Sequence, residues 1–315
     1  MFLEKFSRFF RRYDLTFAPR HKAGAHLPIG EDPNLPNITD ALKQRWRDNK
    51  ALEVQPNGDI VELMDVEFDP KSEALTLLFH RASPNAADPA YRKRARKDAA
   101  GRVTIRTAKK AEDEEQSISA HLVICTNPIK RGIYRSALEE IPGISMSVIR
   151  RIISLALQDY KYDFKKGTQV NETYTTFKPE GVRSETLTNA LKKGELNFIK
   201  LVRPAKPNFV DANGLFEPVN EVMKLRVKGE ITSQNWRNEL KNLIPLAKKA
   251  GWTEFNLDLE LDDERHRTIK IDREQEAKEI LFVRSEQVDF KRELPICSAA
   301  VNPDVVKKAL QIIAA

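Results

Sequence analysis

A series of strand and turn signals over residues 52–83, with period-two alternation of apolar and polar residues at 59–69, is the feature that most restricts the fold of this chain. The segment LEVQPNGDIVELMDVEFDPKSEALTLLFHRAS contains two turn signals, Asn57-Gly58 and Asp69-Pro70. Asn-Gly readily takes positive φ and closes tight hairpins, so the segment is predicted to form three consecutive strands. The stretch SISAHLVICTN, which ends at Asn127, predicts another strand because it is rich in β-branched residues. We therefore expect a sheet interrupted by one long excursion.

Four other stretches carry helix signals. They are residues 37–49, 136–159, 232–250 and 302–315. Asn37 or Thr39 is expected to cap the first, and apolar residues at helical spacing predict that the second is mainly helical. The third is predicted to be broken or kinked at Pro245. In the fourth, Asn302 and Pro303 occupy the cap and first helical positions.

The remaining patterns add strands. Five aromatic residues between Lys5 and Phe17 suit either a helix or a strand, and they are expected to pack in a core. The stretches WTEFNLDLELDD and RTIKID alternate with period two and predict a hairpin. The fold class is therefore predicted to be α+β, with mixed, mainly antiparallel sheets and flanking helices.

Charge is concentrated in two short segments. The chain has 53 Lys and Arg against 46 Asp and Glu, a net charge of +7. Residues 92–110 contain nine basic residues and one acid, and residues 5–22 contain six and one. These segments carry +8 and +5, so the other residues sum to −6. Local basicity of this kind favours docking on a polyanion.

The long excursion, residues 84–117, allows two interpretations. In one, it is a solvated loop whose basic block is neutralised by the acidic cluster Glu112-Asp113-Glu114-Glu115. In the other, it is a flexible basic arm that contacts phosphates, with binding that is salt-sensitive and largely independent of sequence. Residue chemistry alone leaves both open.

Catalytic and cofactor motifs are absent from the sequence. Two cysteines, Cys125 and Cys297, make no disulfide framework, which suits a reducing, cytoplasmic compartment. Cys125 follows His121 by four residues in a strand, too far for a hydrogen bond, and Cys297 has no histidine nearby in the sequence. There is no HExxH motif, P-loop or GxGxxG, so neither metal nor cofactor is expected. No apolar run is long enough for direct membrane insertion.

One acidic region keeps an enzymatic alternative open. Carboxylates and a lysine around a strand end could hold the metal of a nuclease. The residues concerned are Asp258, Glu260, Asp262, Asp263, Glu276 and Lys278. Asp258, Glu260 and Asp262 also alternate along one strand, which is how a solvated sheet face looks.

The stretch LEEIPGIS, residues 138–145, is similar to the hairpin of helix-hairpin-helix modules, in which backbone N–H groups meet a DNA phosphate. Ser145 stands where the second glycine is usual, and an ordinary turn before a capped helix is the alternative. The basic residues expected to contact DNA come from the basic segments and from the surroundings of this turn. They are Arg8, Arg11, Arg12, Arg92, Lys93, Arg94, Arg96, Lys97, Lys130, Arg131, Arg150 and Arg151.

The order of segments resembles that of the RexA-like family of phage exclusion proteins. The resemblance is carried by FSRFFRRYDLTF, ITDALKQRWRDN, the hairpin series LEVQPNGDIVEL to EALTLLFHRAS, SAHLVICTN, SETLTNALKKGELNFIKLVRP and NELKNLIPLAKKAGWTEFNLDLEL. It implies a non-catalytic homodimer that binds DNA without sequence preference. It also implies a globular domain with a central swivel-like domain, here residues 1–165 and 166–285, and a segment 286–315 that returns to the globular domain.

The leading hypothesis is therefore a cytoplasmic DNA-binding protein of phage exclusion, with double-stranded DNA, a second copy of itself and a membrane-protein effector as possible partners. The basic excursion 84–117 looks larger than in the family pattern. The alternatives are the metal-dependent nuclease and a protein-interaction sensor of a phage component.

Overall fold

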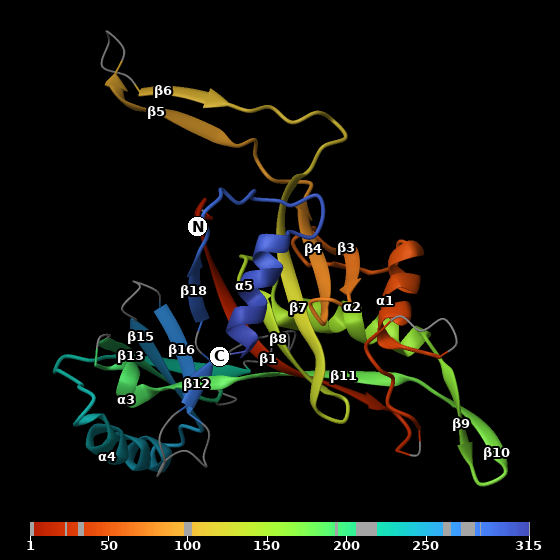
Figure 1. The fold of residues 1–315 in the computed structure, drawn as a ribbon. Helices are drawn as coiled ribbons and strands as arrows, with labels where there is room; N and C mark the ends of the chain where they lie inside the picture. Colours follow the sequence, from red (N-terminus) through yellow and green to blue (C-terminus); the bar gives the residue numbers. More distant parts are fainter. Residues whose placement is uncertain are drawn as a thin grey trace, which may run out of the picture. The chain divides into compact units, whose positions relative to one another are not determined.

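The computed structural model describes residues 3–22, 24–30, 35–97, 103–192, 195–205, 219–260, 266–271, 281–283 and 285–314. The chain divides into two compact units, which we call unit 1 (Met1–Val182 with Ser285–Ala315) and unit 2 (Arg183–Arg284). Figure 1 shows both. The first boundary lies at Val182 and not at residue 165, because the strands between these positions belong to unit 1.

Unit 1 is built on one large sheet with the order β11-β1-β8-β7-β4-β3-β2, and β18 also pairs with β1. The strands are β1 (Ser7–Pro19), β2 (Leu52–Val54), β3 (Ile60–Asp69), β4 (Ala74–Ser83), β7 (Gln116–Lys130), β8 (Ile133–Glu139), β11 (Thr175–Gly181) and β18 (Ser285–Asp289). All of these pairings are antiparallel, which confirms the α+β class with mainly antiparallel sheets.

Helices cover both faces of this sheet. The helices are α1 (Ile38–Arg47), α2 (Met146–Asp159) and α5 (Pro303–Ala314). The larger core joins α1 and α2 to one face, through residues such as Leu77, Leu122 and Ile152. The other face packs against α5 and forms a second core with it, which includes Val123. Because both faces are covered, residues 74–79 of β4 are all buried, and all of them except Thr76 are apolar.

The helix caps expected from sequence are present at two helices. The Asn37 side chain accepts a hydrogen bond from Asp40 N at 2.8 Å, so Asn37, and not Thr39, caps α1. Asn302 Oδ1 accepts from Asp304 N at 3.0 Å at the start of α5. Each side chain satisfies an N–H group that has no partner inside its helix.

Residues 136–145 do not form the expected helix. Ile133–Glu139 is strand β8, which pairs with β1 and β7, and the helix begins only at Met146. The stretch before Met146 contains Pro142 and Gly143, both unfavourable inside a helix. The apolar residues of β8 fill the sheet core, and this long-range packing decides the local structure.

The N-terminal stretch is a strand, which settles the choice left open by its aromatic residues. β1 spans Ser7–Pro19, and Phe10 and Phe17 are fully buried. Phe17 lies 5.0 Å from Phe177 and 5.8 Å from Tyr134 between ring centroids. Phe6, which precedes the strand, is half exposed and lies outside this packing.

Unit 2 has its own sheet and core. The sheet has the order β14-β13-β15-β16, from β13 (Glu195–Pro204), β14 (Asn220–Arg226), β15 (Glu254–Glu260) and β16 (His266–Ile271). Helix α4 (Trp236–Lys249) supplies Trp236, Leu240 and Ile244 to the core, and β15 supplies Leu257. The predicted hairpin of residues 252–272 is confirmed as the β15–β16 pair. The short helix α3 (Leu187–Ala190) follows β12 (Arg183–Thr186), which pairs with β17 (Leu281–Val283).

Helix α4 continues through Pro245. The remaining paired strands are β9 (Tyr162–Lys166) and β10 (Gln169–Thr173), a hairpin of unit 1. Among the helices that the structure describes, none has the length and apolar character needed to cross a membrane.

Candidate nucleic-acid interface

The basic excursion contains a two-stranded antiparallel ribbon. Its strands are β5 (Ala90–Lys97) and β6 (Val103–Thr107), with Tyr91 opposite Arg106 and Arg92 opposite Ile105. The ribbon forms a sheet of its own and pairs with no other described strand (Figure 1). The expectation of a loop over this whole excursion is therefore wrong for residues 90–97 and 103–107, because β-branched residues in β6 give the basic strand β5 a partner.

Both faces of the ribbon combine basic and apolar side chains. Cross-strand partners share a face, so Tyr91 and Arg106 lie on one side and Arg92 and Ile105 on the other. The Arg106 guanidinium lies 5.1 Å from the centroid of the Tyr91 ring. Tyr91 is 53% exposed and Ile105 is 64% exposed. Arg92 and Lys93 are also exposed, whereas the side chains of Arg94, Arg96 and Lys97 lie outside the described residues.

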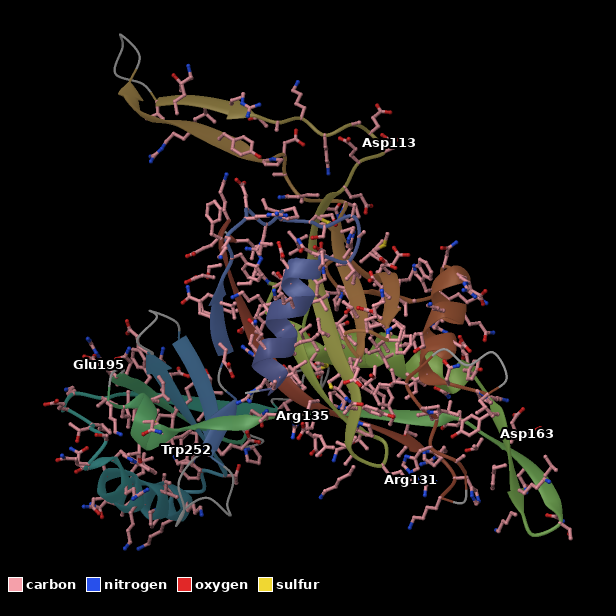
Figure 2. All side chains as sticks on the ribbon, in the orientation of Figure 1. Asp113, Arg131, Arg135, Asp163, Glu195 and Trp252 are labelled. Atoms are coloured by element: carbon pink, nitrogen blue, oxygen red, sulfur yellow. The ribbon has the colours of Figure 1, made fainter. Side chains whose placement is uncertain are left out.

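The acidic cluster after the ribbon does not neutralise it within the described part of the chain. Residues 112–115 are exposed, and no described ion pair joins one of them to a ribbon cation. Instead, Glu114 folds back locally, and its Oε2 accepts from Ala111 N at 2.8 Å. Figure 2 labels Asp113 in the connection that follows β6. The charge of Arg92 and Lys93 is therefore available to a ligand.

Lys110 braces the ribbon where it leaves the body of unit 1. Its Nζ donates to Pro84 O at 2.8 Å and to Ala86 O at 3.2 Å, across the two chain segments that lead into and out of the ribbon. Lys110 N donates to Asp88 Oδ1 at 3.3 Å, and Ala108 N donates to Pro89 O at 2.9 Å. These contacts fix the ribbon's root without using its exposed cations.

A second set of hydrogen bonds holds the end of β4, from which the ribbon departs. Asp59 accepts from Ser83 Oγ at 2.6 Å and from Arg81 Nε at 2.8 Å. These bonds, that from Ser83 first, lower the pKa of the Asp59 carboxyl. Arg81 also donates to Pro142 O at 3.1 Å, which ties β4 to the turn before α2.

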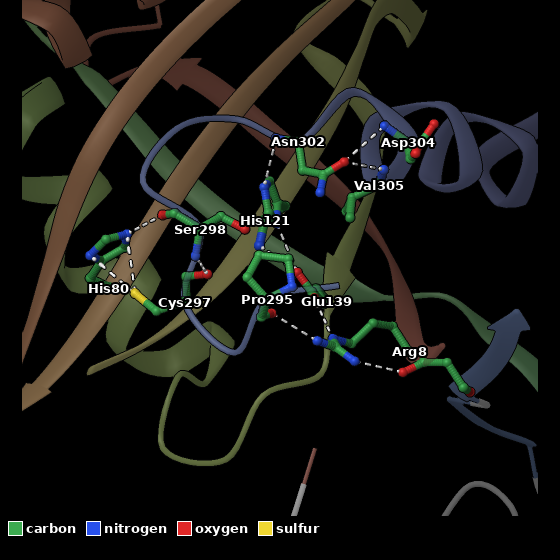
Figure 3. Close-up of polar contacts among 12 residues, drawn as sticks. Arg8, His80, His121, Glu139, Pro295, Cys297, Ser298, Asn302, Asp304 and Val305 are labelled. Carbon is green, nitrogen blue, oxygen red and sulfur yellow. Dashed lines mark hydrogen bonds and ion pairs between the residues drawn. The ribbon is translucent and has the colours of Figure 1, made fainter. Parts of the chain in front are cut away.

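The three arginines of β1, Arg8, Arg11 and Arg12, each pair with a carboxylate of unit 1. Arg8 is 3% exposed, and its Nε lies 2.9 Å from Glu139 Oε1, so its assignment as a DNA contact is wrong. Its Nη2 also donates to Pro295 O at 3.0 Å, as Figure 3 shows. Arg11 pairs with Glu140, and Arg12 lies 3.2 Å from Glu286. Arg11 and Arg12 are partly buried, so most of the positive charge of β1 is neutralised within unit 1.

The other candidates are exposed but lie apart. Lys130 and Arg131 stand at the turn between β7 and β8, whereas Arg150 and Arg151 lie in α2. Strand β8 separates this turn from the loop before α2. Arg151 also pairs with Glu53 at 2.6 Å. The structure therefore does not gather these four cations around one phosphate site.

The similarity of residues 138–145 to a helix-hairpin-helix turn is not reflected in the structure. The motif requires a helix on each side, but a strand precedes this turn. Gly143 has φ +82°, and the Arg81 side chain occupies the place where a Cβ would project. An Ile141–Ile144 bridge closes the turn. Ser145 stands at the N-cap of α2 without a side-chain hydrogen bond.

The carboxylates considered for a nuclease are held by protein partners where the structure describes them. Asp258 lies 2.8 Å from Lys200 Nζ and accepts from Thr268 Oγ1 at 2.6 Å. Glu260 accepts from Asn197 Nδ2 at 2.6 Å. The other four candidates, Asp262, Asp263, Glu276 and Lys278, lie outside the described residues. Within the described part of the chain, no three metal-ligating side chains come together.

Sequence spacing missed one histidine–cysteine contact. His80, from β4, lies beside Cys297, with 3.6 Å from Sγ to Nδ1 and 3.7 Å to Nε2 (Figure 3). Near-equal distances mean that the sulfur does not lie along the lone pair of either nitrogen. His80 Nε2 is 2.7 Å from Ser298 O, so this nitrogen carries the proton. The pair therefore lacks the alignment of a nucleophile with its base.

The chain matches no protein-family model, no curated protein and no solved structure. The candidate interface therefore rests on its own geometry.

Proposed function

We propose that this protein binds double-stranded DNA without sequence preference through the β5–β6 ribbon, as a non-catalytic homodimer in phage exclusion. The observation that carries the DNA-binding part is the ribbon itself. It has exposed cations, it pairs with no other described strand, and no described carboxylate is paired with Arg92 or Lys93.

The ribbon suits a duplex groove in shape. The major groove of B-DNA is about 12 Å wide and admits a two-stranded β-ribbon. Cations on both faces would then meet the phosphates of both strands that border the groove. Arg92 and Arg106 project from opposite faces, which supports this mode of binding. Phosphate contacts carry no sequence information, so unrelated duplexes are expected to bind alike.

The resemblance in segment order to the RexA-like family supports the context of phage exclusion, the homodimer and a membrane-protein effector. Cytoplasmic localisation belongs to the same proposal. The nuclease alternative receives no support from Asp258 and Glu260, which are engaged by Lys200 and Asn197.

Binding to two unrelated 30-bp duplexes at 50, 100 and 200 mM salt tests the proposal. Each phosphate contact contributes about −0.9 to the slope of log K against log salt concentration. Replacing Arg92, Lys93, Arg94, Arg96 and Lys97 together by Gln should lower the affinity for both duplexes equally and make that slope less steep. Absence of wild-type binding at 50 mM salt, or a loss confined to one duplex, would contradict the ribbon model.

The control substitutes Gln for exposed lysines elsewhere in the chain. It uses Lys71, Lys241, Lys291 and Lys307. These changes alter net charge nearly as much but leave the ribbon intact, so a similar loss of affinity would show that only total charge matters. Incubation of plasmid with Mg²⁺ or Mn²⁺ separates passive binding from cleavage, and cleavage abolished by Asp258→Ala would establish the nuclease instead.

A further inference from the structure

Strand β7 connects the ribbon to a second basic surface at its opposite end. At its start, Gln116 pairs with Ser83 at the ribbon's root, and at its end Lys130 leads into the turn to β8. Fourteen residue steps separate Gln116 from Lys130. At about 3.3 Å per residue they span at most about 46 Å. The register shifts between Ile124 and Lys130 make the end-to-end length of β7 somewhat shorter.

Six cations from three segments form this surface, which we call the distal basic surface. They are Arg20, Lys22, Lys130, Arg131, Lys165 and Lys166. Backbone hydrogen bonds bring the segments together: Phe17 N donates to Gly132 O at 2.7 Å, and Arg20 N donates to Tyr174 O at 2.8 Å. The β9–β10 hairpin joins them because Phe164 stacks on His21, with 4.6 Å between ring centroids.

The distal basic surface has a surplus of positive charge. All six side chains are exposed, and none of them forms an ion pair with a described carboxylate. Two nearby carboxylates form ion pairs with lysines outside this surface. Glu172 lies 2.9 Å from Lys161 Nζ, and Glu180 lies 2.5 Å from Lys178 Nζ. Asp163 is an exposed acid on the same hairpin and offsets only part of the charge (Figure 2).

The ribbon and the distal basic surface act independently in salt. Electrostatic interactions between exposed charges are screened beyond about 10 Å at 0.1 M salt. The length of β7 exceeds this several times, so a phosphate bound at one end neither helps nor hinders one at the other. Each surface can therefore hold its own length of DNA.

We propose that the distal basic surface is a second duplex-binding site, so that a single chain holds two DNA segments, one on the ribbon and one at the far end of β7. This inference rests on the proposed function, because the first segment is the one bound by the ribbon. The chemistry recognised is again the phosphate backbone, through Lys and Arg side chains without base contacts.

Co-capture of two duplexes tests this proposal. A biotinylated 30-bp duplex is fixed on beads, and the full chain is added with an unrelated fluorescent 30-bp duplex at 100 mM salt. The distal variant replaces Lys130, Arg131, Lys165 and Lys166 by Gln. It should still be retained by the bead duplex through its ribbon, but its capture of fluorescent duplex should fall at least tenfold.

Two results would overturn the second site. The first is a wild-type protein that binds the bead duplex yet captures no fluorescent duplex, which would mean that one duplex runs across both surfaces. The second is unchanged co-capture by the distal variant, which would mean that two ribbons of a homodimer hold the two duplexes. The variant with Gln at Lys71, Lys241, Lys291 and Lys307 is the charge-matched control and should co-capture normally.

Failure of the proposed function gives a different pattern. A ribbon variant, Arg92→Gln with Lys93→Gln, keeps the distal basic surface and should still be retained by the bead duplex, but it should co-capture less fluorescent duplex than wild type. Wild-type co-capture by this variant, together with reduced co-capture by the distal variant, would contradict the ribbon while leaving the distal basic surface supported. Equal thermal unfolding midpoints show that each variant is folded.

Discussion

Arg8 Nε lies 2.9 Å from Glu139 Oε1 inside unit 1, and both side chains are almost completely buried. The other carboxylate oxygen, Glu139 Oε2, is 2.8 Å from His121 Nδ1. Asn302 N donates to His121 Nε2 at 3.1 Å, so Nδ1 is the nitrogen that donates to Glu139. The chain of contacts links β1, β8 and β7 to the cap of α5 (Figure 3).

Arg8→Met should destabilise unit 1 strongly. Removing one partner of a buried ion pair leaves the other charge uncompensated, which costs about 3–5 kcal/mol. The pair of Arg11 with Glu140, whose side chains are 35% and 28% exposed, is the comparison, and Arg11→Met should cost no more than about 1 kcal/mol. Urea unfolding monitored by circular dichroism measures both. Equal costs for the two substitutions would contradict the structural role of Arg8.

Lys110→Met should loosen the root of the ribbon while leaving the sheet of unit 1 intact. Its Nζ holds the carbonyls of Pro84 and Ala86, and replacing it removes both bonds. Amide hydrogen exchange should become faster at Ala108 and Lys110, whose N–H groups donate to Pro89 and Asp88. Exposed Lys109 provides the matched control, since Lys109→Met removes the same charge. Faster exchange in both variants would show that the loss of positive charge, and not the loss of the Lys110 hydrogen bonds, loosens the root.

Local signals in the sequence predicted the elements whose formation depends on nearby residues. Asn-Gly at residues 57–58 placed the β2–β3 hairpin, and the capping residues Asn37 and Asn302 placed the starts of α1 and α5. Period-two alternation identified β15 and β16. In each case the turn or cap is set by residues within a few positions of one another.

The errors arose where distant packing decides the structure. Residues 136–139 were predicted to belong to the helix indicated by the apolar spacing of residues 148–156, but β1 and β7 lie on either side of them and make them a strand. The burial of Arg8 depends on Glu139, which is far away in the sequence. For the candidate site, sequence predicted where basic residues are concentrated but not the ribbon. It included Lys130 and Arg131 of the distal basic surface but not the other four cations, which the fold brings beside them.

Gly132→Ala should be costly at the turn beside the distal basic surface. Gly132 has φ +74°, and an added Cβ would lie 2.3 Å from His26 Nδ1 and 2.4 Å from Phe17 O. Left-handed backbone costs an L-residue about 1–2 kcal/mol, and overpacking adds roughly 1–3 kcal/mol. Gly167 is the control because its φ is +65° but nothing lies within 4 Å. Gly167→Ala should therefore lower the unfolding free energy only by the cost of the left-handed backbone. Denaturant unfolding measures both variants, and equal losses of unfolding free energy would contradict the predicted clash of a Cβ at position 132 with His26 and Phe17.

Asp59→Asn should remove a pH-dependent contribution to stability near the ribbon's root. Hydrogen bonds from Ser83 and Arg81 lower the pKa of Asp59 below its ordinary 3.8. Between the lowered folded value and 3.8 the unfolded chain binds more protons, so the stabilisation is complete above 3.8 and is lost as pH falls through the folded pKa. Urea unfolding of wild type and Asp59→Asn from pH 7 to pH 2 measures the difference in unfolding free energy. That difference should be constant at neutral pH and shrink only below 3.8, because the protonated wild-type carboxyl then resembles the amide in charge. A difference that stays constant down to pH 2 would show that the Asp59 carboxylate charge contributes nothing to holding β4.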